Sequence, residues 1–107
     1  QGRVDLFARR IGGHWDALMY AAANNHLSVV SHLIRSGGVD VDSRDSSGWT
    51  ALMAAAGAGH KQVVAWLIQE GADVNSKNDK GQTAVVLAKK HTSVVSMLKA
   101  AGAVDVK

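Results

Sequence analysis

The residues whose types could do chemistry do not form a recognisable catalytic or metal-binding pattern. Segment 57–61, GAGHK, shares its composition with a phosphate-binding loop, but such loops need the spacing G-x-x-x-x-G-K, which is missing here. His14, His32 and His91 have no companions at the spacing that a zinc site requires. No serine or cysteine stands beside a base in a nucleophile motif. We therefore expect no enzyme activity, no metal and no cofactor.

The composition is typical of one globular domain in a reducing compartment. The 107 residues are 47% hydrophobic and include no cysteine, which excludes disulfides and cysteine-based zinc sites. No apolar run approaches the roughly 20 residues needed to cross a bilayer, and no signal-peptide pattern is present. An Asn-x-Ser/Thr acceptor for glycosylation is also missing. We expect an intracellular protein, in the cytoplasm, the nucleus or both, that does not insert into membranes.

The charge distribution bears on nucleic-acid binding. The net charge is +3 and the isoelectric point about 9.5, which could attract a polyanion. Cations lie toward the two ends of the chain and acidic residues toward its middle: Arg3, Arg9, Arg10, Lys89, Lys90, Lys99 and Lys107 against Asp40, Asp42, Asp45, Glu70 and Asp73. This pattern indicates charged ends that keep a stack soluble, and it argues against nucleic acid as the partner.

A unit of about 33 residues recurs along the chain and must position all of these side chains. Its most complete copy is residues 45–77. A shift of 33 residues places Gly48 on Gly81, and a shift of 34 in the other direction gives identical residues at many positions between Ala17 and Gly37. Chance does not produce so many identities at fixed offsets, so the chain is a repeat protein.

Each unit predicts one turn followed by two helices. In the central copy, the Ser-Ser-Gly cluster 46–48 predicts a tight exposed loop. Thr50 then stands where the cap of a helix over 51–58 belongs, and Gly59 can end that helix in a left-handed conformation. A second helix is predicted over 61–70, with one broad apolar face.

These segments resemble the ankyrin repeat. The stretches GWTALMAAAGAGH, VV, LI and EGADVN match its turn, first helix, Gly-His link, second helix and exit. The usual proline after the threonine is alanine in all three copies, which weakens the first turn without forbidding it. The resemblance implies an all-α solenoid of stacked helix-turn-helix units with short hairpin-like loops. It also places His26 and His60 at the family's linking position, where a histidine commonly bonds between loops.

The repeat period divides the chain into four segments. These are a short N-terminal segment, 1–10, and the repeats 11–44, 45–77 and 78–107. Apolar residues between Val4 and Ile11 follow the spacing of one helix face. That helix could be an N-terminal cap or the remnant of an upstream repeat, and the sequence leaves both open.

The first repeat departs from the pattern at three points. Asp16 replaces the threonine, and we expect it to cap the first helix, because its carboxylate can accept the free amides there. Asn25 replaces the linking glycine and should adopt its left-handed conformation. The doubled Gly37 and Gly38 add one residue, which should bulge in a surface loop.

The last repeat departs from the repeat pattern in ways that are typical of a terminal cap. Lys89 stands at the place of Ala22 and Ala56 in the inner copies, and Lys99 replaces an isoleucine. A lysine facing another repeat would be costly to bury. The link between the helices, placed at 90–93, is shorter than its counterpart. We expect this repeat to close the stack.

Tryptophans at one register position carry the functional hypothesis. The resemblance implies that the residue between the glycine and the threonine of the turn points toward a concave recognition surface. Trp15 and Trp49 occupy that position in the first two repeats, and Gln82 does in the third. Large aromatics dominate many binding energies, although each ring could instead fold onto its own hairpin. Their recurrence favours binding, whereas Trp66, in a second helix, is expected to pack in the stack.

Further positions would complete this surface. Tyr20 lies on the first helix and is expected to be partly buried. The other candidates are the helix ends Asn24 and Ala58 and the turn residues Ser46, Ser47, Asp79 and Lys80. The resemblance implies a non-catalytic module that binds a peptide or a folded protein. The alternative is a scaffold or regulatory segment that docks to other domains of the same protein or self-associates, and nucleic-acid binding ranks below both.

Overall fold

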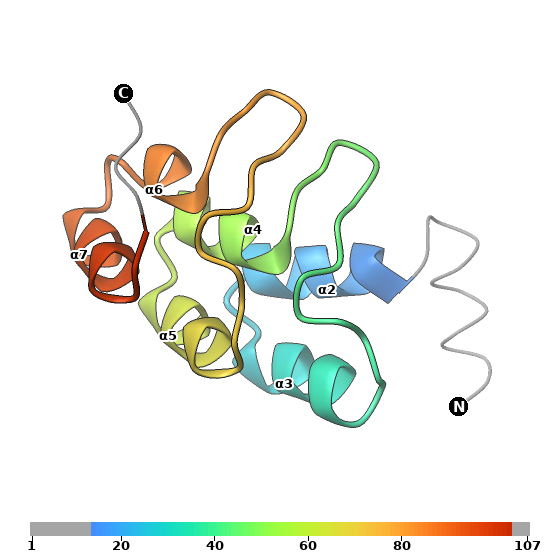
Figure 1. Ribbon diagram of the computed structural model, residues 1–107. Helices are drawn as coiled ribbons and strands as arrows, with labels where there is room; N and C mark the ends of the chain where they lie inside the picture. Colours follow the sequence, from blue (N-terminus) through green and yellow to red (C-terminus); the bar gives the residue numbers. More distant parts are fainter. Residues whose placement is uncertain (1–13, 104–107) are drawn as a thin grey trace.

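The computed structural model describes residues 14–103, and this part of the chain contains helices but no strand (Figure 1). The helices are α2 (His14–Ala23), α3 (Leu27–Arg35), α4 (Ala51–Ala58), α5 (Lys61–Gln69), α6 (Ala84–Leu87) and α7 (Thr92–Ala100). The expected all-α class is confirmed for these residues. None of these helices has the length and apolar character needed to span a membrane. The helix expected near Val4 lies outside the described residues.

The helices are arranged in two layers that repeat along the molecule. The first helices α2, α4 and α6 lie side by side, and the second helices α3, α5 and α7 form the other layer (Figure 1). Two long loops, 36–50 and 70–83, project as hairpins from the same side of the stack. Each repeat therefore contacts its neighbours in sequence, as in a solenoid.

The ends of the helices follow the signals in the sequence. Thr50 Oγ1 accepts a hydrogen bond from the Met53 amide at 3.3 Å, and α4 begins at Ala51, the residue after Thr50. Gly59 ends α4 with a φ of 77°, and Asn25 follows α2 with a φ of 62°. The cap and both left-handed residues are confirmed. The doubled glycine also lies in an exposed loop, where Gly38 has a φ of 72°.

Small residues make the first layer thin. Ala55 and Ala56 of α4 are fully buried, as are Ala22 of α2 and Ala88 after α6. Larger apolar side chains, such as the buried Val64, fill the space between the two layers. Burying a valine or leucine contributes roughly 1.5–3 kcal/mol, so the stability of the stack comes from contacts between repeats.

The third repeat is shortened in its first helix, not in its link. Helix α6 has 4 residues where α4 has 8, and Thr92 and Ser93, expected in the link, belong to α7. The expected boundary was wrong because α7 keeps its register against α5, with Val94 and Leu98 fully buried.

Lys89 and Lys99, the two lysines that replace apolar residues in the third repeat, are exposed. Lys89 follows the end of α6, whereas Ala56, at the matching position, is buried inside α4. Lys99 lies on α7 and is exposed as well. Neither ammonium group is therefore taken out of water, which agrees with the cost of burying a charge.

The first helix begins earlier than expected. Helix α2 starts at His14, so Asp16 lies inside the first turn and the prediction that it caps the helix was wrong. In the second repeat, Asp45 holds the chain extended up to Thr50 by accepting backbone hydrogen bonds. The matching position in the first repeat is Ile11, which has no side-chain acceptor, and the helix starts before Asp16.

The two hairpins are bonded to each other along their length. Asp42 Oδ1 accepts from the Asp73 amide at 2.8 Å, and the Arg44 guanidinium donates to Ser76 Oγ at 2.8 Å. At the tip, the Asp79 amide donates to the Ser47 carbonyl at 2.9 Å. This contact buries Gly48, although the loop was expected to be exposed throughout.

We predict that Gly48→Ala destabilises the protein more than Gly81→Ala. Both glycines have a left-handed φ, 81° and 74°, so both alanines carry a strain of about 1–2 kcal/mol. A Cβ on Gly48 would also stand 2.8 Å from Asp79 Oδ1 and 3.0 Å from its amide nitrogen, whereas nothing lies within 4 Å at Gly81. Crowding should add about 1–3 kcal/mol. Urea unfolding measures both, and equal losses would contradict the contact between the hairpins.

Candidate functional site

Matching side chains hold the two hairpin turns in the same shape. Asp45 Oδ1 accepts from the amides of Ser47 and Trp49 at 2.8 and 2.9 Å. At the same place in the next hairpin, Asn78 Oδ1 accepts from Lys80 and Gln82 at 2.9 and 3.0 Å. These bonds turn the tip side chains outward, and the exposed ones are Ser46, Ser47, Asp79 and Lys80.

The two tryptophans of the hypothesis lie in different kinds of backbone segment. Trp49 lies in the segment before the Thr50 cap and is partly buried. Trp15 is in helix α2, and its side chain lies outside the description. Their shared register therefore does not extend to the backbone, because α2 starts two residues before Asp16.

Tyr20 is an exposed aromatic on the first layer of helices. Its side chain is 67% exposed, so the expectation that it is partly buried was wrong. The matching residue of the next repeat is Ala54, whose side chain is too small to cover a ring. The Tyr20 ring lies 6.3 Å from the His26 ring, and its carbonyl accepts from Asn24 Nδ2 at 2.8 Å.

The remaining candidate residues differ in how exposed their side chains are to solvent. Ala58 and Asn24 are exposed at the ends of α4 and α2, whereas Gln82 is partly buried. Gln82 Oε1 accepts from Asn78 Nδ2 at 3.0 Å, so its amide helps to hold its own turn. The structure thus brings the four tip residues together and places Tyr20 and Asn24 on the helices.

His91 belongs to a series of three histidines, which the sequence pattern did not reveal. His26, His60 and His91 each precede a second helix. His60 Nε2 lies 2.8 Å from the Ala23 carbonyl, which confirms the expected bond between repeats. Counting from α7 would have identified His91, because Val94 and Leu98 match residues of α5. The stretch from Thr83 to His91 is two residues shorter than the stretch from Thr50 to His60, and this difference obscured the register.

Trp66 is engaged within the stack, as expected. It is partly buried against the core, and the Arg35 guanidinium lies 5.3 Å from its ring centroid. Arg35 also pairs with Glu70, whose hydrogen bond, and then its charge, raise the pKa of Arg35. The guanidinium is attracted to the negative face of the indole ring. This cluster stabilises the contact between α3 and α5.

Chemistry at a metal has no support in the described residues. Among the described side chains, those of residues 17–103, no three His, Cys, Asp or Glu groups converge to form a metal site. The described surface instead offers exposed aromatic and polar side chains on a rigid support, an arrangement suited to binding.

Comparisons with known proteins agree with the repeat pattern. Residues 14–107 match the family profile of ankyrin repeats in three copies. One chain in the structure of the Bd0816 predatory endopeptidase from Bdellovibrio bacteriovorus, in complex with the immunity protein Bd3460, is 32% identical with a TM-score of 0.78. The alignment covers 82% of this chain and 47% of that one, so this chain spans about half its length. No curated protein matches.

We predict that Asp45→Ala destabilises the protein while Asp45→Asn does not. Alanine leaves two backbone amides without their acceptor, which costs about 1–3 kcal/mol. Asparagine keeps the accepting oxygen, and Asn78 already accepts the two matching backbone amides in the next hairpin. Urea unfolding of both variants measures the difference. A loss in Asp45→Asn as large as that in Asp45→Ala would show that the negative charge matters, not the acceptor.

Proposed function

This chain belongs to the ankyrin repeat family, and we propose that it is a non-catalytic module that binds a peptide or folded protein on its hairpin tips and first helices. The exposure of Tyr20 carries this proposal. A large aromatic held in water by a rigid helix is the type of residue that dominates binding energy. A bound partner would remove it from water without any rearrangement of the helix.

The solved relative supports a protein as the partner. Its structure is that of an endopeptidase in complex with an immunity protein. At 32% identity, the shared fold extends over most of this chain, while half of the matched chain has no counterpart here. We therefore take from it the class of partner, a protein, and not its identity.

The proposed surface divides its roles between two groups of residues. The aromatic side chains would supply most of the affinity. They are Tyr20, Trp49 and Trp15. The polar group, Ser46, Ser47, Asp79, Lys80, Gln82 and Asn24, with the small Ala58, would set orientation. Exposed polar contacts each contribute little, because water competes for them. The surface would therefore distinguish partners by shape at the helices and by polarity at the tips.

We expect Tyr20→Ala combined with Trp49→Ala to weaken binding strongly. Loss of two aromatic contacts should raise the Kd at least about 30-fold, which is roughly 2 kcal/mol. The partner is first captured from lysate with the unmodified chain, and its affinity for each variant is then measured by calorimetry. Val29→Ala is the matched control, because Val29 is 46% exposed but lies on α3, in the other layer. Circular dichroism verifies the fold.

An unchanged Kd in the double variant, or an equal loss in Val29→Ala, would show that the partner binds elsewhere. The alternative, self-association, is tested by light scattering. We expect the mass of one chain, 11.2 kDa. A dimer that the double variant disrupts would make a second copy of the chain the partner. We place the protein in the cytoplasm or nucleus, and fractionation of cells tests that location.

A further inference from the structure

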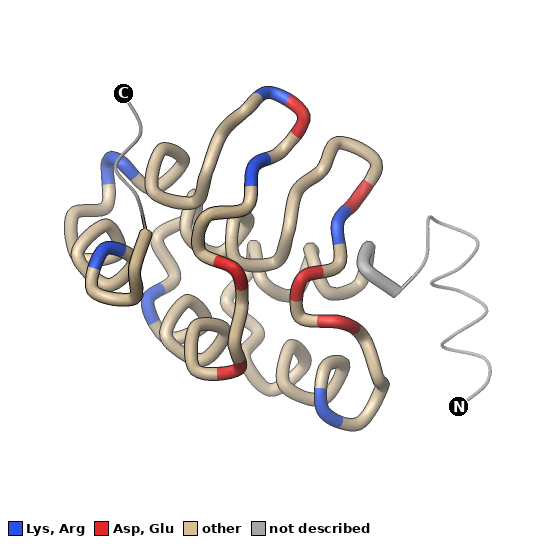
Figure 2. The backbone as a smooth tube through the Cα atoms, viewed as in Figure 1, with Lys and Arg blue, Asp and Glu red and all other residues tan. Residues whose placement is uncertain are grey.

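Among the side chains that the structure describes, none that is acidic lies on the side of the stack where the first helices connect to the second (Figure 2). Segments 17–39, 46–69 and 80–103 contain no aspartate or glutamate. The described carboxylates are on the hairpins and at the end of α5, as Figure 2 shows. We call the three connections, residues 24–26, 59–61 and 88–94, the link edge. Its charged residues are Lys61, Lys89 and Lys90.

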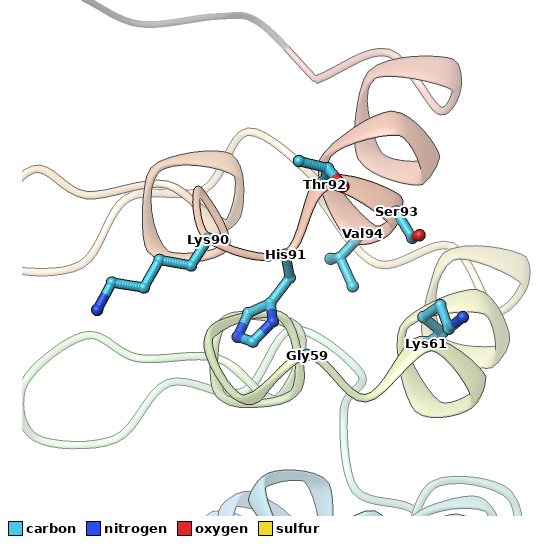
Figure 3. Close-up of a pocket in the computed structure, with 7 residues that line it drawn as sticks. All are labelled: Gly59, Lys61, Lys90, His91, Thr92, Ser93 and Val94. Atoms are coloured by element: carbon cyan, nitrogen blue, oxygen red, sulfur yellow. The ribbon is translucent and has the colours of Figure 1, made fainter.

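A pocket of about 260 Å³ lies in the link edge between the second and third repeats (Figure 3). It is lined by Gly59, Lys61, Lys90, His91, Thr92, Ser93 and Val94. Val94 is fully buried and contributes apolar lining, while the two hydroxyls and the two lysines are exposed. The pocket thus combines an apolar wall with hydrogen-bond donors and positive charge.

The imidazole ring of His91 forms one wall of the pocket. It lies against Gly59, where a Cβ would stand only 2.6 Å from Nδ1 (Figure 3). Glycine at this position therefore leaves room for the ring. The side chain of His91 does not cap α7, although it precedes the helix. It is held by packing and remains at the pocket.

The lysines of the pocket have no internal counter-charge among the described residues. Neither Lys61 nor Lys90 pairs with a carboxylate there, in contrast to Arg35, which pairs with Glu70. Cations gathered on a surface without acids create a positive potential that attracts anionic groups. Lysine acts as a point charge and does not need a planar partner, so single carboxylates suit it.

We propose that the link edge is a second interaction surface, which binds an acidic segment of a protein, with one carboxylate side chain in the pocket between Lys61 and Lys90. The pocket volume, against about 30 Å³ for one water in the liquid, exceeds what a bare ion needs. It suits a side chain whose methylenes contact Val94. Lys61 and Lys90 lie on opposite sides of the His91 ring (Figure 3), and their flexible side chains can turn toward the carboxylate. Lys89 extends the charge toward a neighbouring acidic residue.

The two surfaces meet at Asn24, but the pocket lies at the opposite end of α4 from the hairpin tips. Helix α4 has Thr50 at the hairpin end and Gly59 at the link end, and its 8 residues span about 12 Å. The two surfaces can therefore be occupied by different parts of one partner or by different partners. Each is tested by variants that leave the other intact.

The test is an NMR titration of the ¹⁵N-labelled 107-residue chain with an acetylated, amidated hexaglutamate peptide. We expect saturating shifts at the amides of Lys61 and residues 91–94, and none with hexaglutamine. Lys61→Ala with Lys90→Ala should raise the Kd about five- to tenfold, because two charge contacts are lost. Higher salt should weaken binding in the same way. Both lysines are exposed, so the fold should persist.

Lys77→Ala with Lys80→Ala, on the second hairpin, is the matched control and should change the Kd less than twofold. An equal loss in this control would overturn the proposal, as would absent shifts at residues 91–94. Tighter binding of inorganic phosphate or of a DNA duplex would overturn it in favour of another anion. Lys61→Gln with Lys90→Gln keeps the side-chain length and should reproduce the loss. The Tyr20 and Trp49 variant should bind the peptide normally.

Discussion

The structure depends on how closely the first helices can approach one another. Fully buried alanines such as Ala22, Ala55 and Ala56 replace the larger side chains that would hold α2, α4 and α6 apart. The short distance between these helices brings neighbouring loops within hydrogen-bonding range at both of their ends. At one end the Asp79 amide reaches the Ser47 carbonyl, and at the other His60 reaches Ala23. Without small residues in this layer, neither contact would form.

The same packing divides the surface into two edges of different chemistry. Hairpin carboxylates accept backbone amides, as Asp42 and Asp45 do, so acceptor oxygens are needed there for structure, and at these two residues they carry negative charge. The links are closed by glycine, asparagine and histidine, and carboxylates have no structural role in them. The link edge is therefore left to lysines. A molecule built from one repeated unit thus presents two edges of different charge (Figure 2).

Local signals were sufficient to predict much of this fold. Thr50 and Gly59 mark the ends of α4 because a cap or a left-handed turn involves hydrogen bonds within a few residues. The exposure of the turn residues Ser46 and Ser47 was also predicted, since turn chemistry is local. The start of α2 was mispredicted because Asp16 was judged alone, without the acceptor that Asp45 supplies in the next repeat. The shortening of α6 was misplaced because the packing of α7 on α5 decides which residues are lost.

By itself, the sequence determined the repeat period, the order of the helices and the cap of α4, because each depends on residues close together in the chain. Only the tertiary structure decided which side chains remain in water. Tyr20 is exposed although the sequence predicted partial burial, and Trp49 is partly buried although it lies on a turn. The pocket beside His91 likewise exists only where two repeats meet. Exposure depends on what an adjacent repeat places opposite a residue, and no local pattern encodes that.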